Sequence, residues 1–133
     1  MSKDNVELAR RYYETFNVSG LDGTQPLRHP EIEAFDPPNF PDADRYVGEH
    51  QVRRLVQGYL DLGWDGQFHE PEYIEAGDEV VVVWQLRGLT AHGGGFPVEA
   101  PLAHVCLFEE GKLRRLRQYW SRQEGLEAAG LAE

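Results

Sequence analysis

The chain has 133 residues, of which 41% are hydrophobic and 27% are charged. This length and balance fit one globular domain spanning residues 1–133 and exclude a disordered chain. The 23 acidic residues outnumber the 13 lysines and arginines, and the resulting net charge of −10 argues against nucleic acid or an anionic membrane as a partner.

The N-terminal third is predicted to be mostly helical. Residues 4–17 begin with a capping pattern and carry apolar side chains at helical spacing, so they predict a helix. Residues 21–29 predict a short second helix that ends before a proline. Residues 31–36 predict a strand. The Pro- and Asp-rich segment 37–47 predicts a loop, long enough to act as a lid over a pocket.

The rest of the chain is predicted to be one helix followed by strands. The helix runs from residue 48 to about residue 63 and has a clear apolar stripe. Apolar and β-branched runs predict strands at 67–76, 79–88, 98–108 and 112–121, with a short helical tail at 124–130. A glycine-rich connection covers residues 89–97, and Pro101 suggests a bulge or an edge position. This order predicts an α+β fold with helices on one face of a curved sheet.

Cysteine usage and the chain start predict a cytoplasmic protein. The only cysteine, Cys106, lies in an apolar run and cannot form an internal disulfide. The N-terminus is polar and does not resemble a signal peptide, and no apolar stretch is long enough to span a bilayer. The five histidines lack metal-ligand spacing and no phosphate-binding glycine loop is present, so we expect no metal and no cofactor.

Alternation along the last two strands predicts an apolar face with few polar groups. Leu102, His104 and Phe108 share one face of their strand. Gln118 and Trp120 share one face of the final strand. An apolar concave wall with a few convergent polar groups is typical of a pocket for a small hydrophobic molecule.

Three short motifs resemble the SnoaL-like members of the nuclear-transport-factor-like superfamily. They are Leu27–Glu33, Tyr46–Gly48 and Ala76–Val82, and the resemblance covers nearly the whole chain. It implies a cone-shaped, curved antiparallel sheet with about three N-terminal helices packed on its concave face. Proteins of this fold often pair through the outer face of the sheet, so the resemblance also implies a homodimer.

A closer resemblance to ketosteroid isomerase, a member of this fold, implies catalytic roles. Tyr12 falls at the position of a tyrosine that donates a hydrogen bond to the oxyanion. Asp36, just before a proline, is similar to the catalytic aspartate, and the Tyr119-Trp120 pair is similar to aromatic residues near the end of the last strand. His104 departs from the pattern, because ketosteroid isomerase has a protonated aspartate there.

These residues also have structural interpretations. Asp36 could be the general base or could cap a turn before the proline. Tyr12 could donate to an enolate oxygen or fill the core. His104 could be a base, a donor or a core histidine bonded to the backbone. The expected walls of the pocket are Tyr59, Trp84, Leu102, Phe108, Gln118 and Trp120.

The sequence therefore predicts an isomerase- or cyclase-type enzyme that performs proton transfer on a small hydrophobic carbonyl compound without a cofactor. The alternative is a non-catalytic domain of the same fold that binds a small ligand or dimerises. The two hypotheses differ in one structural expectation. The enzyme requires Asp36 and His104 to line one enclosed cavity.

Overall fold

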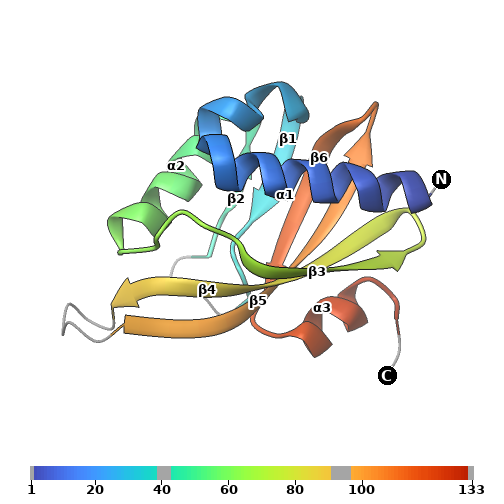
Figure 1. The fold of residues 1–133 in the computed structure, drawn as a ribbon. Coiled ribbons are helices and arrows are strands. Elements are labelled where there is room, and N and C mark those ends of the chain that lie inside the picture. The colour runs from blue at the N-terminus through green and yellow to red at the C-terminus, as the bar shows by residue number, and fades with distance from the viewer. Residues whose placement is uncertain (1, 39–42, 91–96, 132–133) are drawn as a thin grey trace.

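The computed structural model describes residues 2–38, 43–90 and 97–131 (Figure 1). Three α-helices occupy Ser2–Thr24 (α1), Gly48–Asp61 (α2) and Arg122–Ala128 (α3), and a 3₁₀ turn occupies Gln25–Leu27 (η1). Six strands occupy Arg28–Phe35 (β1), Arg45–Val47 (β2), His69–Ala76 (β3), Glu79–Thr90 (β4), Pro97–Glu109 (β5) and Lys112–Tyr119 (β6). Among the described residues, no helix is both long and apolar enough to cross a bilayer.

The six strands form one open, curved sheet in the order β2-β1-β6-β5-β4-β3, which confirms the α+β class. The sheet is mixed rather than antiparallel, because β1 runs parallel to β6 with Ala34 opposite Leu116. The predicted loop 37–47 contains the short strand β2, which pairs antiparallel with β1. Residues 39–42 lie outside the described residues, and so does the predicted hairpin connection at 91–96.

The helices cover both faces of the sheet. Helices α1 and α2 lie on the inner face, whereas α3 lies on the outer face (Figure 1). The expectation of about three N-terminal helices on one face is therefore met by α1 and α2 together with η1. α1 extends beyond the predicted residues 4–17 to Thr24, with a break at Gly20, whose φ of 67° and ψ of −158° are not helical.

The predicted helix 21–29 ends earlier than expected. Arg28 has φ −103° and ψ 136° and begins β1 instead of ending a helix. Pro30 follows His29, and the residue before a proline avoids the helical region of backbone conformation. Pro30 also lies where the register of β1 against β6 shifts, between Arg28 and Glu33. A proline has no N–H for a regular ladder, which accounts for its place there.

Strands β4 and β5 are buried on both sides, as their apolar runs suggest. The inner face of β5 carries Leu102, His104 and Cys106, which confirms the predicted alternation. Its outer face carries Ala103 and Val105, which pack against α3. A Cβ atom on Gly125 of α3 would lie 2.6 Å from the Ala103 Cβ, so the glycine allows close approach of the helix to the sheet.

Pro101 lies at an edge position, one of the two predicted alternatives. It pairs with Gln85 of β4, but pairing of β5 with β6 begins only at Ala103. The irregularity in the pairing of β4 with β5 lies in β4, between Arg87 and Leu89. Pro101 therefore needs no N–H partner on the β6 side.

Candidate functional site

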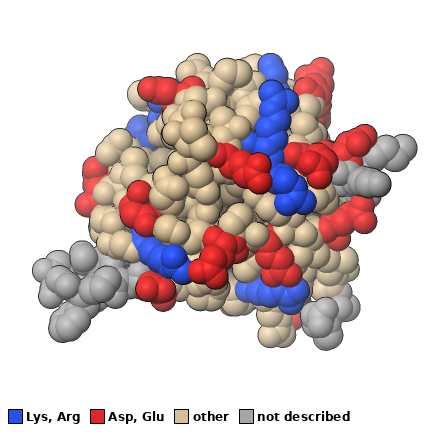
Figure 2. Space-filling view, in the orientation of Figure 1, with Lys and Arg blue, Asp and Glu red and all other residues tan. Residues whose placement is uncertain are grey.

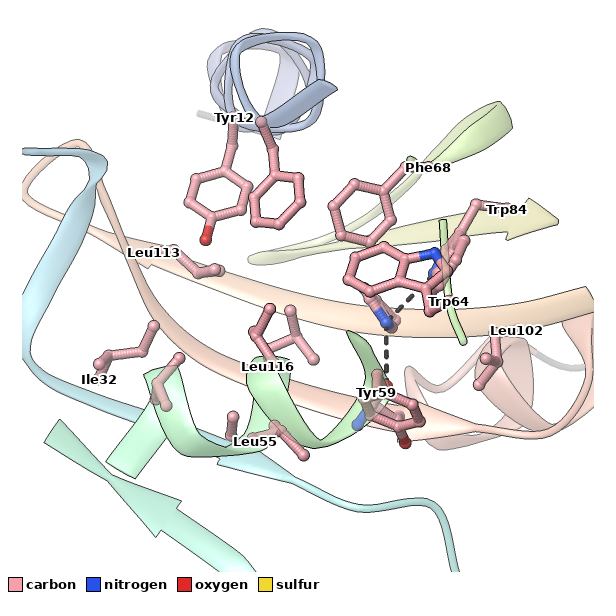
Figure 3. Close-up of a pocket in the computed structure, with 16 residues that line it drawn as sticks. Tyr12, Ile32, Leu55, Tyr59, Trp64, Phe68, Trp84, Leu102, Leu113 and Leu116 are labelled. Carbon is pink, nitrogen blue, oxygen red and sulfur yellow. Dashed lines mark hydrogen bonds between the residues drawn. The ribbon is translucent and has the colours of Figure 1, made fainter. Parts of the chain in front are cut away.

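A pocket lies between the inner face of the sheet and helices α1 and α2, and we call it the main pocket (Figure 3). It contains about 60 Å³ of free space, whereas one water molecule needs roughly 10–15 Å³. Six of the predicted site residues line it, namely Tyr12, Tyr59, Trp84, Leu102, His104 and Gln118. The rest of the wall is apolar and consists of Phe16, Ile32, Ala34, Val52, Leu55, Val56, Trp64, Phe68, Leu113 and Leu116.

Arg28, at the start of β1, is the centre of one polar end of the main pocket. Its side chain is fully buried. Its Nε and Nη2 donate to the two carboxylate oxygens of Glu49 at 2.8 and 2.7 Å. Nη1 donates to the Tyr12 hydroxyl at 3.1 Å and to the Thr24 hydroxyl at 2.7 Å. Nη2 also donates to the Leu21 carbonyl at 2.7 Å. All five guanidinium donors therefore have acceptors.

The hydrogen bonds to Glu49 decide the charge state of this end. Burial acts to lower the pKa of Arg28, but the hydrogen bonds to Glu49 and Tyr12 outweigh it and raise the pKa. Burial acts to raise the pKa of Glu49, yet the Arg28 and Arg53 guanidinium groups hold it below its usual value. The two groups therefore stay ionised together, and we call Arg28, Glu49, Thr24 and Tyr12 the charged end of the pocket.

Tyr12 lies between Arg28 and the interior of the main pocket. Figure 3 shows its oxygen directed into the pocket, on the side of Leu113. Arg28 occupies one lone pair of that oxygen, so the hydroxyl proton is directed to another acceptor, either Thr24 or a group in the pocket. Burial raises the pKa of Tyr12. The positive charge of Arg28 and the hydrogen bonds with Arg28 and Thr24 oppose the rise. A neighbouring cation makes this hydroxyl a stronger donor.

The other polar end is centred on His104 of β5. The Tyr13 hydroxyl lies 2.5 Å from its Nδ1, and Trp84 Nε1 donates to its Nε2 at 3.1 Å. Gln118 Oε1 lies 3.3 Å from the same Nε2, while Gln118 Nε2 donates to the Phe35 carbonyl at 3.1 Å. We call Tyr13, Trp84, His104 and Gln118 the neutral end of the pocket.

This second end carries no charge at neutral pH. Burial lowers the pKa of His104 from 6.5 to about 3, and the Gln118 hydrogen bond opposes only part of that effect. Burial also raises the pKa of Tyr13 well above its ordinary value. His104 is therefore a neutral imidazole and a weak base at pH 7.

Asp36 lies outside the main pocket, in a neighbouring groove of about 130 Å³. Its Oδ2 accepts hydrogen bonds from the Asp44 backbone N–H at 3.1 Å and from the Tyr46 hydroxyl at 3.2 Å, so it joins the end of β1 to β2. Burial raises its pKa, and these two hydrogen bonds oppose the rise. Asp36 and His104 thus do not line one cavity, although Leu55 and Tyr59 line both spaces.

Two of the predicted wall residues also lie away from the main pocket. Trp120 is 39% exposed and donates its indole N–H to the Pro38 carbonyl at 2.7 Å. It follows the end of β6 at Tyr119, so strand alternation no longer sets its direction. Phe108 is partly buried and packs against the main core without lining the pocket.

Four residues of the two polar ends are not predicted by the sequence, namely Tyr13, Thr24, Arg28 and Glu49. Arg28 was assigned to a helix, but a strand that began there would have placed it on the buried side with Ile32 and Ala34. That alternation was the available signal. Pairing of Arg28 with Glu49 depends on how α2 packs against β1, which no local pattern specifies.

Charged side chains elsewhere form mixed-sign pairs. On the outer face of the sheet, Arg115 and Arg117 contact Glu79 at 3.3 and 3.0 Å. Figure 2 shows basic and acidic side chains interspersed on one face of the molecule, without a continuous basic patch on the part of that face described. Within the described chain, no group of three His, Cys, Asp or Glu side chains is placed to hold a metal ion.

Comparisons with known proteins agree with this architecture. The sequence model of the SnoaL-like domain matches residues 9–116. The structure of TerC, crystallised with polyporic acid, is 20% identical with a TM-score of 0.70, over 95% of this chain and 98% of that chain. A candidate polyketide cyclase from Xanthomonas campestris is 17% identical with a TM-score of 0.73, over 97% and 99% of the two chains.

A third solved structure leads to the same fold. A protein from Burkholderia thailandensis, described as NTF2-like, is 24% identical with a TM-score of 0.72, over 95% of each chain. A comparison with curated proteins gives no match. At these identities the similarity establishes the fold of the chain.

Proposed function

Because the chain belongs to the SnoaL-like domain family, we propose that its main pocket binds a small, mostly apolar molecule that contains a ring. The observation that carries this proposal is the composition of the wall. Trp64, Phe68 and Trp84 contribute aromatic surface, and only a few side chains, such as Tyr12, Tyr59, His104 and Gln118, bring polar atoms to the wall. Such a pocket favours apolar ligands and orients them through few hydrogen bonds.

Binding is supported better than catalysis within the main pocket itself. Proton abstraction next to a carbonyl needs a base within hydrogen-bond reach of the substrate. Among the described residues that line the main pocket, none is a carboxylate. The imidazole of His104 has a pKa of about 3 because it is buried, so it holds a proton poorly at neutral pH.

The second candidate function is proton transfer of the isomerase or cyclase type, and the position of Tyr59 favours it. Tyr59 lines both the main pocket and the groove of Asp36, so a ligand that displaced its ring would reach from one space to the other. Asp36 has a pKa raised by burial, which suits a general base. Tyr12, polarised by Arg28, would donate to the oxygen that becomes negative.

One experiment tests binding. Titration calorimetry with 1-indanone, a small bicyclic ketone, is expected to detect binding to the wild-type protein. Ala34→Leu adds apolar volume inside the pocket wall and is expected to weaken binding at least about tenfold, because a filled cavity excludes the ring. Val18→Ala, at an 86% exposed position, is the matched control. Equal affinity in all three proteins would contradict binding in the main pocket.

The same ligand separates the two candidate functions. Proton transfer predicts exchange of the α-hydrogens of 1-indanone with deuterated water, followed by proton NMR, and loss of that exchange in Asp36→Asn. If 1-indanone binds but its α-hydrogens exchange no faster than in buffer, the ligand-binding function is supported and the catalytic one is rejected.

A further inference from the structure

Two groups approach Nε2 of His104 that a neutral imidazole cannot satisfy together (Figure 3). Trp84 Nε1 lies 3.1 Å from this nitrogen, and an indole N–H can only donate. Gln118 Oε1 lies 3.3 Å from it, and an amide oxygen can only accept. A ring nitrogen either carries a proton or accepts one, so His104 satisfies only one of these neighbours.

The geometry favours Trp84 as the partner that His104 satisfies. Its contact is the shorter one, and a buried N–H without an acceptor is rarer in proteins than an oxygen with an empty lone pair. The proton of the imidazole then sits on Nδ1, where the Tyr13 hydroxyl at 2.5 Å accepts it. The Tyr13 hydroxyl can in turn donate to Cys106 Sγ, 3.4 Å away. Nε2 of His104 therefore carries no proton, accepts from Trp84 and donates nothing to Gln118 Oε1.

The orientation of the Gln118 amide is fixed by its other contact. Its Nε2 donates to the Phe35 carbonyl at 3.1 Å, and turning the amide over would bring two oxygens together. The oxygen consequently faces His104, and Gln118 is one of the residues that line the main pocket. Tyr59 has a hydrogen bond with the same amide, and an amide oxygen has two lone pairs, so it can accept from a ligand as well.

We propose that Gln118 Oε1 accepts a hydrogen bond from a hydroxyl group of the ligand, which makes the ligand class small apolar alcohols and phenols. The inference rests on the proposed binding function of the main pocket. A ligand hydroxyl placed at Gln118 supplies the proton that His104 Nε2 does not. A ligand with only ether or carbonyl oxygens leaves His104 Nε2 and Gln118 Oε1, which are both acceptors, facing each other. The ring of such a ligand would lie against Trp84 and Leu102.

The test uses p-cresol and p-xylene, which share one shape and differ by a hydroxyl in place of a methyl group. Calorimetry gives the ratio of their dissociation constants for the wild type, for Gln118→Met and for Gln123→Met. Gln118→Met keeps the length of the side chain and removes the acceptor, so the ratio is expected to shift roughly tenfold against p-cresol. Gln123→Met makes the same change at an exposed position of α3, away from the main pocket, and is the matched control, with an unchanged ratio.

Each outcome has a distinct meaning. A ratio that stays constant in Gln118→Met, or that shifts equally in Gln123→Met, overturns the assignment of Gln118. Failure of both probes to bind the wild-type protein overturns the proposed function itself. If Gln118→Met does not fold, the inference can still be tested on the wild-type protein. ¹⁵N NMR distinguishes the two tautomers of His104. We expect the proton on Nδ1, and a proton on Nε2 would overturn the inference.

Discussion

The charged end and the neutral end of the main pocket bury polar groups in different ways. At the charged end, a fully buried guanidinium is matched by the carboxylate of Glu49, and every donor of Arg28 has an acceptor. At the neutral end, His104 has no charge, and one proton is shared among several candidate partners. The charged end therefore depends on keeping both partners, whereas the neutral end depends on where a proton sits.

The largest effect is expected from removing one partner at the charged end. Glu49→Met leaves Arg28 buried without a counter-charge and should lower the free energy of unfolding by about 3 kcal/mol. Arg28→Met combined with Glu49→Met should recover much of that loss, because no charge remains buried. Urea unfolding measures all three proteins.

The surface pair between Arg45 and Glu33 provides the control for this experiment. Arg45 is exposed, so Arg45→Met should cost less than about 1 kcal/mol. If Glu49→Met costs no more than Arg45→Met, the charged end does not have the role described here.

A pH-dependent effect is expected at the neutral end. Unfolded His104 binds a proton near pH 6.5, whereas the folded residue resists protonation down to about pH 3. The unfolded state therefore holds more protons in this window, and stability must fall as the pH falls through it. The wild type should lose up to about 1.4 kcal/mol more per pH unit than His104→Gln. Urea unfolding between pH 6.5 and 4 checks this, and His50→Gln, at an exposed position, is the control.

The smallest effect is expected from Tyr13→Phe, which tests the proton arrangement of the neutral end. Loss of the hydroxyl leaves Nδ1 of His104 without its partner and should cost about 1–2 kcal/mol of unfolding free energy. The proton should then move toward Nε2, where Gln118 accepts it, and ¹⁵N NMR would record the change of tautomer. An unchanged tautomer would mean that Trp84 alone fixes the proton.

The sequence predicted the frame of this site better than its polar contacts. Alternation on β5 placed Leu102 and His104 on the inner face, because strand geometry has a strict period of two. The same argument failed at Trp120, which lies beyond the last paired residue of β6. The resemblance places Asp36 in the pocket. Its hydrogen bonds to Asp44 and Tyr46 instead depend on strand β2, which the sequence does not predict.

The two-sided burial of β5 has a consequence for engineering. Leu102 and His104 line the main pocket, whereas Ala103 and Val105 pack in the layer beneath α3. The lining of the main pocket and the packing beneath α3 can therefore be varied on alternate positions of one strand. Gly125 limits such changes, because any larger residue there would clash with Ala103 and push α3 away from the backbone that both sets of residues share.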